Sequence, residues 1–157
     1  MSQILAGEKE QGLALSGADS NNMKLEDDHF CFVCGSLNIS GLKLSFELNK
    51  KNETISTEFV PQKIHQGYKD IVHGGLIGLI LDETMVNLAW KLGKPAVSAE
   101  YTIKLSKPAT IGKKLTFTSK IISEKGKLLI IEGECLDENS QKIASSTSKC
   151  MKINKST

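Results

Sequence analysis

The chain has 157 residues, of which 39% are hydrophobic, and its formal net charge is +2 at neutral pH. This length suits one domain with a substantial core, and the apolar content excludes an intrinsically disordered chain. A charge so near balance, with scattered rather than clustered lysines, argues against a nucleic-acid partner.

The sequence shows no targeting or membrane signal. No charged start leads into an apolar region, and no apolar run reaches membrane-spanning length. We therefore expect a cytoplasmic protein without a membrane partner, in which the cysteines Cys31, Cys34, Cys135 and Cys150 are reduced. The first residues are polar, so we expect residues 1–28 to form an N-terminal tail and residues 29–157 to form a single domain.

The first predicted elements are two strands. Apolar and polar residues alternate over residues 42–48, and a second strand is predicted over residues 54–60, where Pro61 ends it. Residues 62–72 are expected to form a loop. A long apolar stretch then predicts a helix over residues 74–92, which Gly93-Lys-Pro95 terminates.

Four further strands are predicted at residues 97–105, 114–123, 128–136 and 143–153, with turns between them. In the first of these, strict alternation separates Ser98 and Glu100 from Tyr101, Ile103 and Leu105. A run of antiparallel strands with a single helix must bury that helix against one face of the sheet.

The predicted helix carries Asp82, and apolar segments rarely contain an acid without a partner. At about 100° per residue, a face of small side chains lies within about 40° of this acid. It consists of Gly75, Gly78, Val86 and Ala89. Because one helix offers this face no evident partner within the chain, we predict a dimer with Asp82 near the subunit boundary. A purely structural role for Asp82, as a cap or a pairing partner, is the alternative.

Three motifs occur in order along the chain. Cys31-Phe-Val-Cys-Gly35 is followed by Asn38 and Gly41-Leu-Lys-Leu44; His73-Gly74-Gly75 is followed by Asp82, nine residues after the histidine; and the strand from Val97 runs into Lys107-Pro-Ala109. Together they resemble the hotdog-fold acyl-CoA thioesterases of the phenylacetate-pathway and 4-hydroxybenzoyl-CoA type. The resemblance spans roughly residues 30–153.

This resemblance implies an α+β hotdog fold, in which an antiparallel sheet of about six strands wraps around one long central helix. It also implies hydrolysis of acyl-CoA thioesters without a cofactor or metal, by a homodimer or by a homotetramer built as a dimer of dimers. Asp82 matches the catalytic nucleophile or general base, and Gly74 matches the glycine whose backbone N–H polarises the thioester carbonyl. The residues expected to contact the substrate or support the site are His73, Gly75, Gln66, Ser98 and Glu83.

The chain departs from the family pattern at two positions. The amide side chain that relatives place six residues before the histidine is replaced by Gly67, although a one-residue shift would let Gln66 serve. Val86 stands where some relatives have a threonine. The residues alone still suit the chemistry, because preorganised N–H donors stabilise the charge on the carbonyl oxygen and a carboxylate near them attacks or activates water.

Two other functions remain open. A non-catalytic acyl-CoA-binding protein would share the fold. An enoyl-CoA hydratase of this fold would carry a histidine about five residues after the aspartate, where this chain has Asn87. His73 has two possible roles, as a catalytic base or as a structural residue that holds the loop at the helix start.

The Cys31 and Cys34 pair suggests zinc or redox chemistry. A structural zinc site needs four ligands, and the chain has no second pair of this spacing, although His29 and Cys135 offer candidates. A thioredoxin-like role requires a βαβ context that is missing. We therefore expect two reduced, packed cysteines and no metal.

Overall fold

The computed structural model describes residues 25–153, so the predicted tail lies outside the described residues except for residues 25–28. The strands and helices are β1 (Glu47–Asn49), β2 (Thr54–Phe59), a short 3-10 helix (Lys63–His65), β3 (Gln66–Tyr68), β4 (Ile71–Val72), α1 (Gly74–Lys91), β5 (Ala96–Leu105), β6 (Leu115–Lys125), β7 (Leu128–Asp137) and β8 (Lys142–Lys152).

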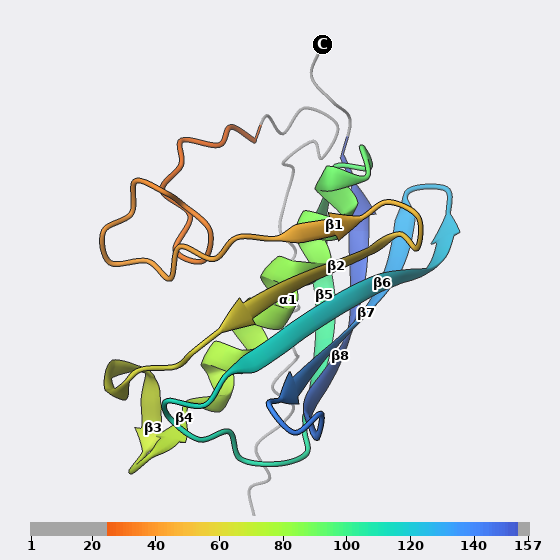
Figure 1. Cartoon of the computed structure of the whole chain (residues 1–157). Coiled ribbons are helices and arrows are strands. Elements are labelled where there is room, and N and C mark those ends of the chain that lie inside the picture. Colours follow the sequence, from red (N-terminus) through yellow and green to blue (C-terminus); the bar gives the residue numbers. More distant parts are fainter. Residues whose placement is uncertain (1–24, 154–157) are drawn as a thin grey trace, which may run out of the picture.

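One antiparallel sheet curves around α1 (Figure 1). Its six strands lie in the order β1-β2-β6-β7-β8-β5, so β5 is an edge strand. Because consecutive strands β6, β7 and β8 are joined by short turns, their order follows the sequence. The predicted α+β architecture, a six-stranded antiparallel sheet around one central helix, is confirmed.

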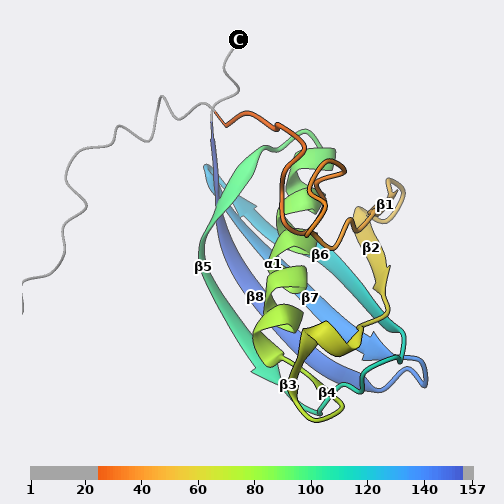
Figure 2. The ribbon, with the colours of Figure 1, turned by 90° about the vertical axis from the view of Figure 1, so that its left-hand side faces the viewer.

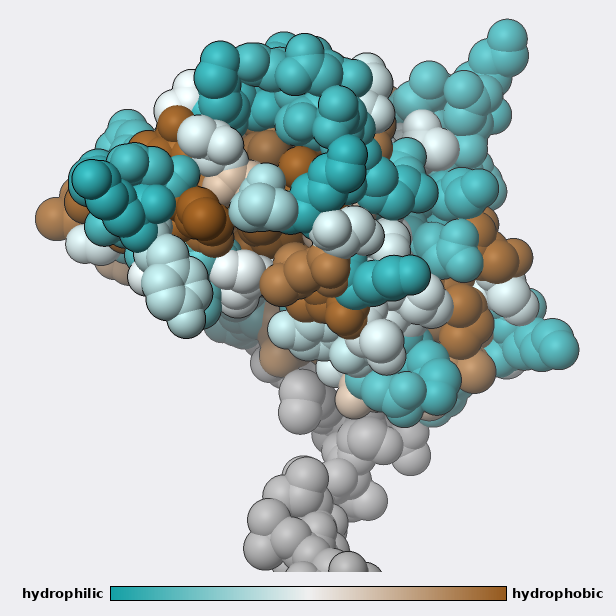
Figure 3. All heavy atoms as spheres, turned by 90° about the horizontal axis from the view of Figure 1, so that it is seen from below, coloured by the Kyte–Doolittle hydropathy of each residue, from teal (hydrophilic) through white to brown (hydrophobic). Residues whose placement is uncertain are grey.

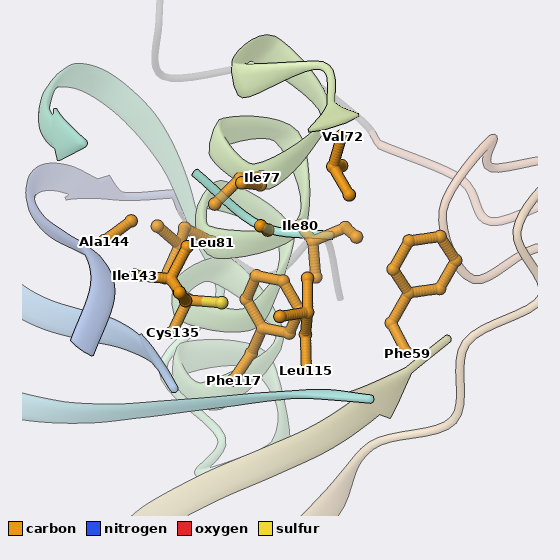
Figure 4. Close-up of a cluster of buried hydrophobic side chains, with 11 residues drawn as sticks. Phe59, Val72, Ile77, Ile80, Leu81, Leu115, Phe117, Cys135, Ile143 and Ala144 are labelled. Carbon is orange, nitrogen blue, oxygen red and sulfur yellow. The ribbon is translucent and has the colours of Figure 1, made fainter. Parts of the chain in front are cut away.

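The helix α1 forms the core together with the concave face of the sheet. Ile77, Ile80 and Leu81 point toward Leu115 and Phe117, and all five side chains are at most 3% exposed (Figure 4). Further along the helix, a second cluster contains Met85, Leu88 and Ala89 with Ile55, Leu129 and Ile131. Fully burying each large apolar side chain contributes about 1.5–3 kcal/mol, so α1 is held by packing rather than by helix propensity.

The strand predicted over residues 42–48 is wrong in extent, because only β1, from Glu47, lies in the sheet. The backbone N–H groups of Leu42 and Leu44 donate instead to the carbonyl groups of Phe32 and Val33, both at 2.8 Å. The predicted alternation still decides burial, since the apolar side chains of this segment pack against the core clusters.

The loop predicted over residues 62–72 contains regular structure instead. The 3-10 helix leads into the β3–β4 hairpin, whose pairing is local and short. The N–H of His73 donates to the carbonyl of His65 at 2.9 Å, and that of Val72 donates to Ala109. These bonds fix the entry of the chain into α1.

Residues 25–46 form an irregular segment that crosses α1 on the side away from the sheet (Figure 2). No helix in the described part of the chain is long and apolar enough to span a membrane. At the end of the molecule where α1 begins, apolar patches interrupt a largely polar surface (Figure 3). Ile64 and Tyr68, both more than 80% exposed, belong to the segment just before that helix.

Candidate active site

Asp82 and Ser98 meet between α1 and β5. The Ser98 hydroxyl donates to the Asp82 carboxylate, with an Oγ to Oδ1 distance of 2.5 Å. Partial burial raises the pKa of Asp82 above its ordinary value, the Ser98 hydrogen bond acts in the opposite direction, and the charge of Glu83 raises it further. The Asp82 carboxylate is thus oriented by Ser98 and is more basic than an aspartate in water.

A β-bulge in β5 brings Ser98 to the helix. The register against β8 shifts between Ser98 and Glu100, so the strict alternation expected for this strand is wrong at this point. Alternation alone would place Ser98 on the opposite face from Ile103, yet Ser98 contacts Asp82 and Ile103 packs on Gly78 of the same helix. The extra residue of the bulge places Ser98 on the same face of the strand as Ile103, the face toward α1. Bulges commonly redirect a side chain in this way.

The start of α1 presents backbone donors. His73 is the N-cap residue, and its Nδ1 accepts the N–H of Gly75 at 3.0 Å. The N–H of Gly74 is the first of the helix and has no hydrogen-bond partner among residues 25–153. A free donor at the positive end of a helix suits a developing negative charge.

The small face of α1 has a partner within the chain at Gly78, contrary to the reasoning from sequence. A methyl group added at Gly78 would overlap Cδ1 of Ile103, and one added at Gly74, outside this face, would lie 2.6 Å from Cδ1 of Leu105. Both leucine and isoleucine belong to β5. Small residues therefore let α1 approach the edge strand of its own sheet, and the small face by itself is no argument for a dimer.

The side chain of Gln66 forms a hydrogen bond within the β3–β4 hairpin. Its Oε1 accepts the N–H of Asp70, in the turn of that hairpin, at 3.3 Å. The neighbouring Gly67 approaches His73 closely, because an added Cβ would lie 3.2 Å from the His73 Cα. A role for Gln66 toward a substrate remains a prediction.

Glu83 is directed to the cysteine motif. Its Oε1 accepts hydrogen bonds from the Cys34 thiol at 3.0 Å, from the Cys31 thiol at 3.6 Å and from the Asn87 amide at 2.8 Å. Sequence reasoning kept the two cysteines and Glu83 apart, because 49 residues separate Cys34 from Glu83. The available signal was the Cys-x-x-Cys-Gly spacing itself, which indicates a tight turn with both thiols on one side.

Gly74 and Asp82 lie on the same helix, eight residues apart. At a rise of 1.5 Å per residue, the two are separated by about 12 Å along the helix axis. Hydrogen bonding and attack on one carbonyl group both require distances of about 3 Å. The Gly74 donor and the Asp82 carboxylate of one chain therefore do not converge on one reacting carbon.

Residues 69–144 match the family model of the thioesterase superfamily. The matched segment contains the His73-Gly74-Gly75 turn, all of α1 and Ser98. No curated protein matches the sequence.

Several solved structures share the fold of this chain. A thioesterase superfamily protein aligns with a TM-score of 0.74 at 21% identity, covering 78% of this chain and 60% of its own length. The PaaI protein from the phenylacetic acid degradation operon of E. coli aligns with a TM-score of 0.67 at 17% identity, covering 72% and 81% of the two chains. A Streptococcus mutans protein, smu.793, solved with bound acetyl CoA, aligns with a TM-score of 0.65 at 15% identity. This alignment covers 71% of this chain and 91% of the S. mutans chain. The family-model match confirms the predicted resemblance to the thioesterase superfamily, and the solved structures show the shared fold.

Proposed function

We propose that this chain, with its hotdog fold and its thioesterase superfamily match, hydrolyses acyl-CoA thioesters to a free acid and CoA. The observation that carries the proposal is the half-buried Asp82 carboxylate, held by Ser98 inside the matched segment. The S. mutans structure with acetyl CoA supports CoA thioesters as the substrate class. A cytoplasmic location stays a prediction from the sequence.

In the proposed reaction, Asp82 either removes a proton from water or attacks the thioester carbon itself. A C–O bond forms, the C–S bond breaks, and CoA leaves as a thiolate that takes up a proton. When Asp82 is the nucleophile, the product of this step is an acyl-aspartyl anhydride, which a water molecule then hydrolyses to release the free acid and restore the carboxylate. The Gly74 N–H stabilises the charge on the carbonyl oxygen, a contact for which one donor typically supplies about 3 kcal/mol. Ser98 orients the Asp82 carboxylate, while His73 holds the helix start in shape.

We further propose that each active site is shared between two chains. Because Gly74 and Asp82 are about 12 Å apart on one helix, a second copy must supply one of the two groups. A two-fold axis would place the helix start of each copy beside the Asp82 of the other, generating two equal sites.

The edge strand β5 suits contact with that second copy. It is ten residues long and has no partner strand on its outer side within the described residues. Tyr101 and Leu105 are 46% and 54% exposed along it. An exposed, apolar edge is a template for pairing with another chain, and β5 also carries Ser98.

The variant Asp82→Asn tests the catalytic carboxylate. Turnover over a panel of short, medium, long and aromatic acyl-CoAs, measured by thiol release, should fall about a hundredfold or more, in line with a lost general base. The fold should persist with an unchanged or higher melting temperature, because the asparagine removes the cost of partly burying a charge. Parent-level turnover by the variant would refute the assignment. An acyl-CoA-binding protein without activity would show no turnover even as the parent.

Two substitutions at Gly74 isolate the oxyanion donor. Gly74→Ala and Gly74→Pro both add a Cβ against Leu105, but only proline removes the N–H. The structure tolerates the ring, since ψ of His73 is 124°, within the range preferred before proline, and proline is accepted in a first helical turn.

The proline variant should therefore lose about a hundredfold more turnover than the alanine variant, with little difference in substrate affinity. Both variants are made in a Leu105→Ala background if the parent background unfolds. Equal turnover in folded Gly74→Ala and Gly74→Pro proteins would place the oxyanion donor elsewhere.

A further inference from the structure

Three metal-ligand side chains converge on the outer side of α1. The thiols of Cys31 and Cys34 and the carboxylate of Glu83 have ligand atoms within 4.8 Å of one another. All three residues are half-buried, so the cluster is shielded but open to an ion from solvent. The proposed mechanism assigns no bond-making or proton-transfer step to these three groups.

Hydrogen bonds and close packing fix the conformation of the turn that carries the two cysteines. The Gly35 N–H donates to the Cys31 carbonyl at 2.8 Å, and the Val33 N–H points to the Cys31 sulfur at 3.4 Å. A Cβ at position 35 would lie 2.5 Å from backbone atoms of Cys31 and His29, so only glycine fits. The turn therefore fixes the position of the Cys31 sulfur.

The turn is also fixed relative to α1. The Leu42 and Leu44 N–H groups donate to the carbonyls of Phe32 and Val33, and the Leu42 and Leu44 side chains pack on the core. From the helix, the Asn87 amide holds the Glu83 carboxylate at 2.8 Å. Both halves of the cluster are therefore preorganised.

We propose that Cys31, Cys34 and Glu83 bind a zinc ion, with a water molecule as the fourth ligand. Thiolate ligands select zinc over calcium or magnesium, and zinc accepts a carboxylate oxygen beside them. With Zn–S of about 2.3 Å and Zn–O of about 2.1 Å, a tetrahedral site needs S···O separations of about 3.6 Å. Cys31 and Glu83 already have this separation, and Cys34 needs to move by about 0.6 Å.

The proposed site departs from the sequence expectation of two reduced, packed cysteines without a metal. The ligands considered there were His29 and Cys135. Cys135 is fully buried in the core cluster beside Leu81, and neither residue belongs to the converging group. The third ligand is Glu83, and its neighbour along the helix is Asp82, so the bound ion would join the N-terminal segment to the helix that carries the proposed catalytic acid.

Metal binding is measured on the full chain, reduced and stripped of metal. Titration with Zn²⁺ against a chromophoric chelator should give one ion per chain. Substitution with Co²⁺ should give the near-ultraviolet thiolate charge-transfer band and the strong visible bands of a four-coordinate ion. Zn²⁺ should also raise the melting temperature by several degrees, since a ligand that binds only the folded state stabilises it.

The variants Cys34→Ser and Glu83→Gln should each bind Zn²⁺ at least tenfold more weakly, and Cys34→Ser should reduce the Co²⁺ charge-transfer intensity. Cys135→Ala is the matched control, because it removes a thiol far from the cluster and should leave affinity and stoichiometry unchanged. Circular dichroism checks that each variant is folded.

Either of two results would overturn the proposal: a parent chain that binds no Zn²⁺ while both cysteines are reduced, or unchanged affinity in folded Cys34→Ser and Glu83→Gln. None of these measurements depends on thioester hydrolysis, so the zinc site and the proposed function stand or fall separately.

Discussion

The pair Asp82 and Ser98 balances two opposing effects at the residue scale. Partial burial and the adjacent Glu83 favour the protonated acid, whereas the Ser98 hydroxyl favours the carboxylate. The raised pKa means that the folded chain holds the Asp82 proton more tightly than the unfolded chain does. Between the ordinary pKa and the raised one, this group therefore lowers the free energy of unfolding as the pH rises. Such a cost in stability is common at functional sites.

The variant Ser98→Ala should shift the acid side of the pH–activity profile. Loss of the hydroxyl removes the one contact that lowers the Asp82 pKa, so the carboxylate should require a higher pH to ionise. We expect the acid limb of kcat/KM to move to higher pH while activity at high pH falls less. The exposed Ser106, just after β5, provides the control Ser106→Ala, which should keep the parent profile. An acid limb that stays in place, or moves to lower pH, would contradict the assignment of that limb to Asp82.

At the scale of elements, the contact between α1 and β5 depends on missing side chains. Gly78 is buried, and the space for a Cβ is taken by Cδ1 of Ile103. The same helix carries Asp82 and the same strand carries Ser98. We therefore expect packing at Gly78 to affect the hydrogen bond on which the proposed site depends.

The variant Gly78→Ala should destabilise the fold by about 1–3 kcal/mol, because overpacking forces side chains or backbone to move. Ile103→Val removes the obstructing Cδ1, so the double variant should recover most of that loss. Denaturant unfolding of the parent, both single variants and the double variant gives the coupling energy. Additive effects of the two substitutions would show that Gly78 and Ile103 do not compete for the same space.

At the scale of the whole molecule, the central question is whether one chain makes one site. Gly74 and Asp82 are fixed about 12 Å apart by the geometry of a single helix, and no rearrangement of side chains changes that separation. In a dimer, Gly74 of one chain could lie beside Asp82 of the other. The exposed apolar residues of the edge strand β5 offer a surface for that contact. Sedimentation should accordingly show no stable monomer at micromolar concentration.

Complementation between inactive chains tests the shared site. Asp82→Asn and Gly74→Pro chains, carrying different tags, are co-expressed and the mixed dimers are purified through both tags. One site of each mixed dimer then has both functional groups intact, so about half of the parent activity should return. Mixed dimers of two differently tagged Asp82→Asn chains should stay inactive. If the first mixed dimers are equally inactive, each chain makes its own site and the two-chain proposal is wrong.

The helix and the six strands of the main sheet were predictable from sequence, and so was the buried side of the segment at residues 42–48. These features follow from local periodicity, because the apolar stretch at residues 74–92 and the alternation at residues 42–48 each depend only on residues close together in the chain. The motif around His73 and Asp82 likewise depends on spacing along one helix. Its start at Gly74 was correct because the glycine pair and the N-cap residue are adjacent in the chain.

Which functional groups meet depends on contacts between segments far apart in the sequence. The bulge in β5, which turns Ser98 to Asp82, depends on pairing with β8, about 50 residues further along the chain. The cluster of Cys31, Cys34 and Glu83 likewise joins segments far apart in sequence. The strand at residues 42–48 was overextended because its first N–H groups pair with the cysteine turn. Tertiary packing determines which of several possible segments pairs with a given strand or helix. Sequence periodicity indicates which face of an element is buried, but not which segment covers that face.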